Sequence, residues 1–239
     1  MKGIQPDTLS LFAYDNGAVC PNPRGIVLDF HGLGGGGMQE EHDAYALLLA
    51  EYGGLLVRPY DNPWSWMNDV AVHTADAIVD AVRATYGLSA ETPLISTGAS
   101  MGGLSALVYP VYTKHRVTAV AANCPVCDLP YHYKERRDLP RTLYSAFGHY
   151  ACSLEEALRS ASPLHLAARF PHVPFYIAHG DADGAVAKSM HSDKLAAAMK
   201  ELSYKLTYDE VPGMGHCALS GDALERYRGF ILRALGGTT

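Results

Sequence analysis

Short apolar runs alternate with longer amphipathic stretches along most of this chain. Runs of this kind have the length of buried strands, roughly 4–8 residues. They lie at residues 25–30, 54–59, 92–97, 118–123, 173–178 and 204–211. Most of these runs are mainly apolar, which is typical of strands that are covered on both faces.

The stretches between these runs have helical spacing. Residues 69–86 place apolar side chains such as Val72, Ile78 and Val79 on one helix face, and Gly87 follows as a C-terminal cap. Further helices are expected at 103–109, 188–202 and 218–235. Alternating strands and helices predict an α/β fold, with a mostly parallel sheet of about seven strands and helices on both faces.

Two segments depart from this alternation. Residues 8–14 are expected to form an additional strand, antiparallel and at the sheet edge, before the turn at Asp15, Asn16 and Gly17. Residues 125–171 contain a charged run, 134–138, and a helical passage at 153–160. We expect a small cap insertion there, over the site; the alternative is a surface connection whose charges are solvated. The whole chain, 1–239, is otherwise expected to be one α/β domain.

Composition excludes several classes of protein. The net charge is −6 and the calculated pI is about 6.0, so no basic field is available for nucleic acid. The N-terminus has no apolar core of signal-peptide length, and no apolar run approaches a bilayer span, so we expect a soluble, cytoplasmic protein without a membrane partner. Five cysteines, an odd number, do not indicate a disulfide framework. The sequence does not determine whether the protein forms homo-oligomers.

Candidate chemistry begins at Gly98-Ala99-Ser100-Met101-Gly102, a G-x-S-x-G pattern between an expected strand and an expected helix. Such a sharp strand-to-helix turn exposes the serine, and the glycines leave room for its crowded backbone. The N-terminus of the following helix also points free N–H groups at an oxyanion beside the serine. Ser100 is therefore the candidate nucleophile.

A nucleophilic serine needs a base and an acid, which in this architecture follow it along the chain in the order acid, then histidine. Asp181 and Asp183 follow the expected strand 173–178, and His216 follows the expected strand 204–211. Both loops would lie at the carboxyl edge of the sheet, where open α/β sheets place their sites. Asp128, after the strand 118–123, is a more distant candidate for the acid.

In these motifs the chain resembles the α/β-hydrolase superfamily, within it the small serine esterases and the catalytic domains related to prolyl oligopeptidase. The matching residues are 31–35 (HGLGG), 98–102, His179-Gly180-x-x-Asp183-x-x-Val186 and Gly215-His216. The resemblance implies Ser100 as nucleophile, Asp183 as acid and His216 as base. It also implies an oxyanion hole from the backbone N–H groups of Met101 and Leu33, with Gly34 as the alternative to Leu33.

Aromatic residues near the same edge are candidates for substrate contact. Trp64 and Trp66 follow the strand 54–59, and Tyr131 lies in the expected cap. Flat aromatic surfaces there could hold an aryl group or a sugar ring. The alternative is that the tryptophans pack their loop against the domain.

No metal and no cofactor are expected. Cys124 and Cys127 form a single CxxC pair, and structural zinc needs four ligands, which Cys152 and Cys217 would supply only by coincidence of folding. The two cysteines are better explained as small residues at the end of a core strand. Glu40, Glu41 and Asp43 are explained by the dipole of a helix they begin.

These residues predict a serine hydrolase that cleaves small acyl, aryl or acylated-sugar esters through an acyl-serine, and so a carboxylesterase with a small-molecule ester as its partner. A serine at position 100, rather than aspartate or cysteine, argues against dehalogenase, epoxide hydrolase or dienelactone hydrolase chemistry. Related peptidases carry a large propeller that this chain has no room for. A peptidase or an acyltransferase with the same triad stays the alternative, and a non-catalytic binding protein a distant one.

Overall fold

A computed structural model describes residues 3–236, and in that range the strands form one seven-stranded sheet. The strand order is β1-β3-β2-β4-β5-β6-β7. The strands are β1 (Ala13–Asp15), β2 (Gly25–Phe30), β3 (Gly54–Pro59), β4 (Leu94–Ala99), β5 (Ala119–Asn123), β6 (Phe175–Gly180) and β7 (Leu206–Val211). All pairs are parallel except that of β1 with β3. The α/β fold expected from the sequence is thus confirmed.

The start of the chain differs from the expectation. A strand was predicted over 8–14, and β1 is indeed the antiparallel edge strand, but it holds only Ala13–Asp15. The residues before it, Pro6–Leu11, form a 3₁₀ helix, η1. Pro6 suits a first helical turn, and the side chains of Gln5 and Thr8 satisfy backbone groups there. Local capping therefore overrides the apolar pattern.

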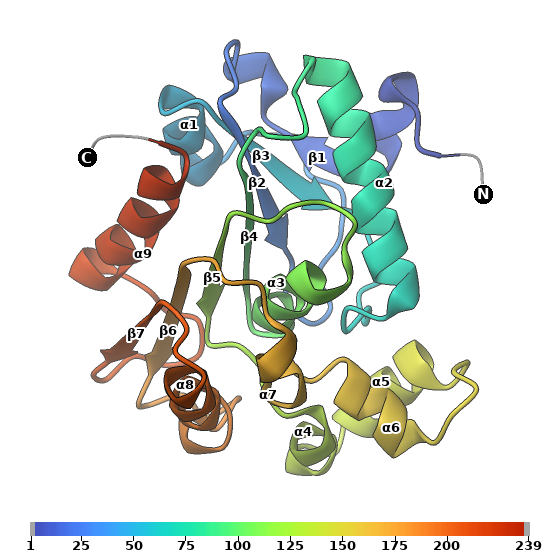
Figure 1. Cartoon of the computed structure of the whole chain (residues 1–239), viewed down its shortest axis with the longest axis vertical. Helices are drawn as coiled ribbons and strands as arrows, with labels where there is room; N and C mark the ends of the chain where they lie inside the picture. Colours follow the sequence, from blue (N-terminus) through green and yellow to red (C-terminus); the bar gives the residue numbers. More distant parts are fainter. Residues whose placement is uncertain (1–2, 237–239) are drawn as a thin grey trace.

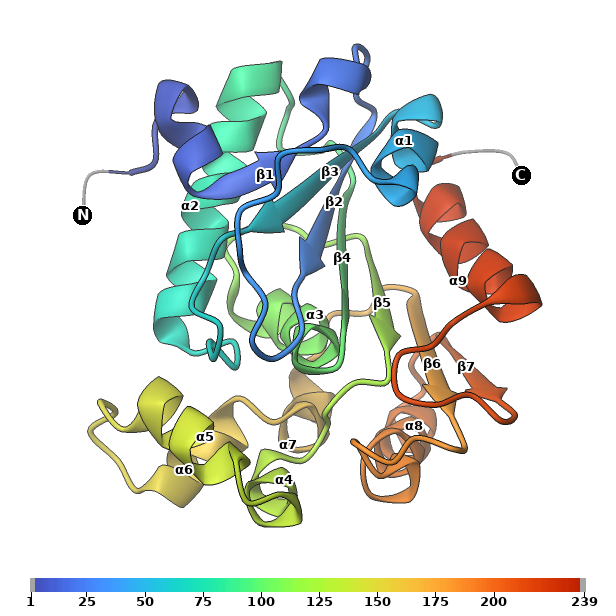
Figure 2. The same ribbon diagram turned by 180° about the vertical axis from the view of Figure 1, so that it is seen from behind.

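Helices cover both faces of the sheet (Figures 1 and 2). One face packs against α1 (Ala44–Glu51) and α9 (Gly221–Ala234), and the other against α2 (Asp69–Tyr86), α3 (Met101–Tyr112) and α8 (Ser192–Glu201). Neighbours in β2 show the alternation: Val27 joins the core with α1 and α9, whereas Ile26 and Leu28 join the core on the opposite face. Both sheet faces are buried, as the apolar runs predicted.

Helix boundaries follow local caps. The range of α2 is the predicted one, and Gly87 ends it in the left-handed conformation. The first helix begins at Ala44, so of the early carboxylates only Asp43 takes a helical role, as the N-cap that accepts from the Ala46 N–H at 2.8 Å. The helix predicted over 188–202 begins at Ser192, after a 3₁₀ turn, η4 (Lys188–Met190). Another 3₁₀ turn, η2, spans Gly17–Val19.

The segment 125–171 folds as a group of short helices, which we call the helical insertion. These are α4 (Leu129–Glu135), α5 (Leu139–Phe147), α6 (Leu154–Ser160), α7 (Pro163–Leu166) and a 3₁₀ turn, η3 (Ala167–Arg169). They gather below the sheet in Figures 1 and 2, at the end where β5 leaves it. Only α6 was predicted. Prolines in the first turns of α4, α5 and α7 are the sequence signal for the others.

Within residues 3–236 no helix combines the length and the apolar character that a membrane crossing requires.

Candidate active site

Ser100 occupies the turn between β4 and α3. Its backbone has φ 58° and ψ −119°, a conformation that costs energy for any residue with a side chain. A Cβ added at Gly98 would collide with the carbonyl group of Gly102, and one added at Gly102 would collide with the Phe30 carbonyl oxygen. Glycine is thus required on both sides of Ser100. The strained turn has the geometry of the nucleophile elbow that the pentapeptide predicts.

Three side chains that are distant in sequence form a chain of hydrogen bonds. Ser100 Oγ lies 2.9 Å from His216 Nε2, and His216 Nδ1 lies 2.7 Å from Asp183 Oδ2. The side chain of Asp183 is fully buried, whereas that of His216 keeps 30% of its surface exposed. The order serine, histidine, carboxylate can move a proton from Ser100 Oγ to His216 Nε2 while Asp183 holds the ring.

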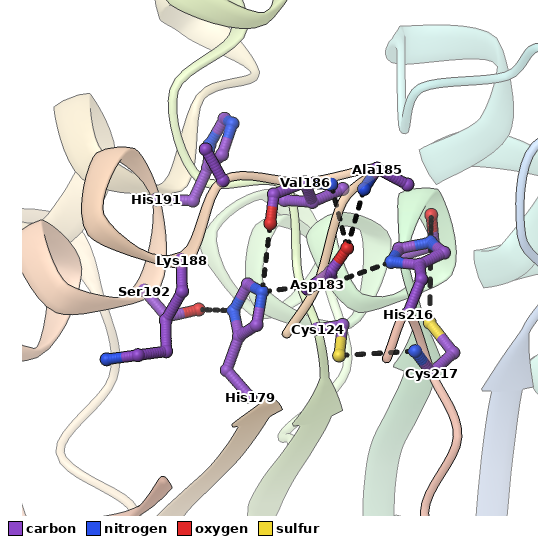
Figure 3. Close-up of polar contacts among 12 residues, drawn as sticks. Cys124, His179, Asp183, Ala185, Val186, Lys188, His191, Ser192, His216 and Cys217 are labelled. Atoms are coloured by element: carbon purple, nitrogen blue, oxygen red, sulfur yellow. Dashed lines mark hydrogen bonds and ion pairs between the residues drawn. The ribbon is translucent and has the colours of Figure 1, made fainter. Parts of the chain in front are cut away.

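Asp183 accepts hydrogen bonds on both oxygens (Figure 3). Its Oδ1 accepts from the N–H groups of Ala185 at 2.8 Å and Val186 at 3.0 Å. Its Oδ2 lies 3.1 Å from Nε2 of a second histidine, His179, which Figure 3 shows on the opposite side of Asp183 from His216. The sequence placed His179 in this loop, but its contact with the carboxylate was not foreseen.

The surroundings of His179 determine where its proton lies. Its Nε2 faces two acceptors, Asp183 Oδ2 and the Val186 carbonyl oxygen at 3.2 Å, so Nε2 carries a hydrogen. Its Nδ1 lies 2.5 Å from Ser192 Oγ, whose hydroxyl can donate to it. The side chain of His179 is fully buried. His179 thus donates a hydrogen bond to Asp183 from within the core.

These contacts shift the acidity of the pair. Burial alone would raise the pKa of Asp183, but hydrogen bonds from His179, His216 and the two amides outweigh it and hold that pKa well below its ordinary value. The hydrogen bond to Asp183, followed by that to Cys124, raises the pKa of His216 to about 9. Asp183 is therefore ionised at neutral pH, and His216 binds a proton more readily than a free histidine.

The loop after β2 offers backbone donors beside Ser100. The Gly34 N–H already donates to the Pro63 carbonyl oxygen at 2.9 Å. The N–H groups of Leu33 and Met101, by contrast, have no hydrogen-bond acceptor within residues 3–236. Free donors at the start of α3 and in the facing loop can receive an oxyanion. The geometry therefore favours Leu33 over Gly34, the alternative that the sequence left open.

His31 holds this loop in place. Its Nδ1 lies 2.8 Å from the Gly32 carbonyl oxygen, and its Nε2 contacts the Asp61 carboxylate, which follows β3. Both ring nitrogens thus face acceptors. Burial would lower the pKa of His31, but its bonds to Asp61 and Gly32 raise it above the ordinary value. His31 thus connects the loops that follow β2 and β3.

The other two candidate acids have different roles. Asp181 Oδ1 accepts from the Gly213 N–H at 2.6 Å, in the loop that leads to His216. Asp128 caps α4 by accepting from the Tyr131 N–H at 3.1 Å. The structure therefore brings Asp183, and neither of these two, to His216.

The three aromatic candidates lie in different settings. Trp66 is only 1% exposed, and its Nε1 donates to Thr142 Oγ1 of α5 at 3.1 Å, so it packs the loop against the helical insertion. Trp66 therefore packs its loop against the domain, as the alternative interpretation proposed, and its ring is not accessible to a ligand. Trp64 is partly exposed beneath the Arg141 guanidinium, 4.8 Å from its ring centre. Tyr131 is partly exposed and contacts the edge of the His191 ring.

A buried polar network joins the helical insertion to the loop of Asp183. Glu135 Oε2 lies 2.6 Å from His132 Nδ1 and 3.0 Å from His191 Nε2, and Glu135 Oε1 accepts from the Ala187 N–H at 3.1 Å. His191 Nδ1 accepts from the N–H groups of Cys127 and Asp128, so its Nε2 carries the hydrogen donated to Glu135. The charged run in the sequence gave no sign of this network.

The CxxC pair does not come together as ligands. Cys127 is buried and its thiol faces the Pro125 carbonyl oxygen at 3.4 Å, while Cys124 Sγ accepts from the Cys217 N–H at 3.3 Å. No cluster of three metal-ligating side chains within residues 3–236 includes Cys127. The cysteine that folding places beside Cys124 is instead Cys217, the neighbour of His216.

Known proteins resemble this chain in sequence or in fold. Residues 64–238 match the prolyl oligopeptidase family. No curated protein matches the sequence. Among solved structures, a puromycin-hydrolysing peptidase of Mycobacterium tuberculosis is similar (TM-score 0.68, 20% identity, 89% of this chain) and so is the Pyrococcus horikoshii acylaminoacyl peptidase (0.73, 13%, 92%). A truncated carbohydrate esterase from gut microbiota (0.69, 17%, 90%) and the esterase PE8 (0.62, 17%, 90%) are similar too.

The similar chains differ in length. The match spans 33% of the first peptidase and 39% of the second. It spans 87% of the carbohydrate esterase and 95% of esterase PE8.

Proposed function

This chain belongs to the prolyl oligopeptidase family, and we propose that it is a serine hydrolase that cleaves carboxylic esters through an acyl-serine intermediate. The observation that carries the proposal is the continuous path from Ser100 Oγ to His216 Nε2, 2.9 Å, and from His216 Nδ1 to Asp183 Oδ2, 2.7 Å. A strained elbow serine joined in this way to a buried carboxylate has the arrangement of an activated nucleophile.

Acylation follows from the positions of these groups. Neutral His216 accepts the proton of Ser100 on Nε2 while Ser100 Oγ bonds to the acyl carbon. The carbonyl oxygen becomes an oxyanion, which the free N–H groups of Met101 and Leu33 can receive. His216 then returns the proton to the leaving alcohol oxygen as the ester bond breaks. Asp183 stays ionised and stabilises the imidazolium that forms.

Deacylation repeats the sequence with water. His216 takes a proton from a water molecule as its oxygen bonds to the acyl carbon, and gives that proton to Ser100 Oγ as the acyl-serine bond breaks. The products are a carboxylic acid and the free enzyme. The chain's own residues supply each proton transfer in both halves.

Two observations support an ester rather than a peptide as substrate. A truncated carbohydrate esterase and esterase PE8 are matched over 87% and 95% of their length, so a fold of this extent occurs in proteins described as esterases. Trp64 and Tyr131, each partly exposed, supply aromatic surface suited to an aryl or sugar ester.

A matched pair of substrates tests the proposal. Each acyl group, from acetyl to hydroxycinnamoyl, is tested both as an ester and as an anilide. N-acyl aminoacyl anilides are tested as peptidase substrates, and Ser100→Ala serves as the control enzyme. We expect turnover of esters and none of the anilides. Turnover of aminoacyl anilides would instead identify a peptidase. If an added alcohol is converted to a new ester and less free acid forms, the enzyme is an acyltransferase.

A further inference from the structure

Two thiols lie beside the catalytic histidine, and the mechanism uses neither. Cys217 directly follows His216, and its Sγ is 3.5 Å from His216 Nε2. Cys124 directly follows β5, and its Sγ is 3.3 Å from the Cys217 backbone nitrogen. Figure 3 shows Cys124 next to Asp183, and the Cys217 side chain next to His216. The two Sγ atoms and a His216 ring nitrogen all lie within 4.8 Å of one another.

The spacing of these atoms suits a tetrahedral zinc ion. Zinc bonds of about 2.1 Å to nitrogen and about 2.3 Å to sulfur, at a tetrahedral angle, separate the two ligand atoms by about 3.6 Å. The distance between His216 Nε2 and Cys217 Sγ is 3.5 Å. Two thiolates and one imidazole are also the ligand types that zinc prefers. The His216–Cys217 pair therefore has the spacing of zinc ligands, and the cluster as a whole has the donor chemistry of a zinc site.

A second cluster, which contains two histidines, does not meet these conditions. In the network of His132, Glu135 and His191, the nitrogen and oxygen atoms are 2.6 and 3.0 Å apart. Bonds of about 2.1 Å to a shared zinc ion would hold such atoms about 3.4 Å apart. These short distances are those of ordinary hydrogen bonds, so the thiol cluster is the better candidate.

An ion can reach the thiol cluster from solvent. Cys217 is half-buried and lines a cavity of about 320 Å³, which Tyr45, Asn123 and Tyr227 also line. Asn123 Oδ1 is buried and has no hydrogen-bond partner within residues 3–236.

We propose that Cys124, Cys217 and His216 bind a thiophilic divalent cation, Zn²⁺ in the first place, and that this ion inhibits the enzyme. The two thiols release their protons to the solvent as the Zn–S bonds form. The third bond uses the lone pair of His216 Nε2, the same pair that would accept the Ser100 proton. Zinc and catalysis therefore exclude each other. The inhibition rests on the proposed function, whereas the binding does not.

Binding is tested first, without any activity. The full chain, kept reduced with a phosphine, is titrated with Co²⁺, which gives a thiolate-to-metal charge-transfer absorption when cysteines bind it. We expect this absorption, and one Zn²⁺ per chain that displaces the Co²⁺. Cys217→Ala should lose the absorption. Cys152→Ala, which removes an exposed thiol of the helical insertion, is the matched control and should keep it.

Inhibition is tested next, with each enzyme compared to its own zinc-free rate. We expect Zn²⁺ to inhibit ester hydrolysis and a chelator to restore it. The zinc concentration for half inhibition should rise at least about tenfold in Cys217→Ala, because even groups that only support a ligand change metal affinity 10–100-fold. The same rise in the zinc concentration for half inhibition is expected for Cys124→Ala. Mg²⁺, which prefers oxygen ligands, should not inhibit.

Two results would overturn the proposal: a wild-type chain that shows no thiolate absorption with Co²⁺, or a Cys217→Ala enzyme as sensitive to Zn²⁺ as the wild type. Thiolate absorption without hydrolysis of any ester would uphold the site and reject the proposed function. If Cys124→Ala fails to fold, measurements on Cys217→Ala still test the proposal, because Cys217 is only half-buried.

Discussion

His179 Nε2 lies 3.1 Å from Asp183 Oδ2, the oxygen that also faces His216 Nδ1 at 2.7 Å. One carboxylate oxygen therefore serves two imidazoles, while the other accepts from two backbone amides. With this many donors, a fully buried Asp183 stays ionised and keeps one orientation. His179 is thus a positioning residue that acts on the base through Asp183.

Replacing Asp183 by Asn should lower kcat by about 10⁴-fold, the loss seen when a triad histidine takes the wrong tautomer. The amide presents an N–H where the carboxylate accepted one, so His216 loses the acceptor for Nδ1. Steady-state hydrolysis of the best ester measures the effect. Asp181→Asn is the matched control, because Asp181 only accepts from the Gly213 N–H. If Asp181→Asn proves the more damaging change, the assignment of the acid is wrong.

Activity should rise with pH. His216 must be neutral to accept the Ser100 proton, so it is inactive below its pKa, and the bonds to Asp183 and Cys124 raise that pKa from 6.5 to about 9. The profile of kcat/KM against pH should therefore show a midpoint above 6.5. Cys124→Ala removes the second cause and should move the midpoint to lower pH. A midpoint at or below 6.5 in the wild type would contradict this account.

Most of the fold could be predicted because it depends on short-range patterns. Apolar runs indicated six of the seven strands within residues 3–236, and helical spacing with Gly87 gave the bounds of α2. The early strand was overestimated because Pro6 and the Gln5–Thr8 caps favour a 3₁₀ helix locally. The helices α4 and α7 were missed since each is short. In α5, Leu139, Leu143 and Phe147 do have helical spacing, so that helix could have been predicted.

The site was predictable only in part for a similar reason. Ser100, Asp183 and His216 follow strands in a known order, so chain order alone brings them together. The pairing of Cys124 with Cys217 depends instead on how the ends of β5 and of the His216 loop meet, and those residues are 93 positions apart. The hydrogen bond between Glu135 and His191 could not be predicted for the same reason, because these residues are 56 positions apart in the sequence.

His31→Ala should lower kcat by up to about 100-fold, because loss of one oxyanion donor costs about 10²–10³ and a loosened loop presents Leu33 less well. His31 connects the loop to Asp61, so its removal frees the segment that carries the Leu33 N–H. Steady-state kinetics should show the loss in kcat with little change in KM. His172→Ala, which removes a ring stacked on Tyr204, is the control. Equal losses in both variants would reject the role of His31.

Glu135→Ala should lower the free energy of unfolding by about 2–4 kcal/mol, because it breaks hydrogen bonds to a buried charged group and leaves their donors unpaired. His132, His191 and the Ala187 N–H would all lose their acceptor. Urea denaturation measures the change. Glu155→Ala removes an exposed helical ion pair with Arg159 and should cost only about 0.3–0.5 kcal/mol. Similar losses in both variants would mean that the network does not stabilise the fold.

The central claim is that Ser100 is an activated nucleophile, and covalent labelling tests it most directly. The intact chain is treated with a fluorophosphonate, and its mass and the labelled peptide are determined, beside Ser100→Ala and His216→Ala. We predict one adduct per chain, on Ser100, no adduct in Ser100→Ala and slow labelling in His216→Ala. An unlabelled wild-type chain, or an adduct that persists in Ser100→Ala, would contradict the account.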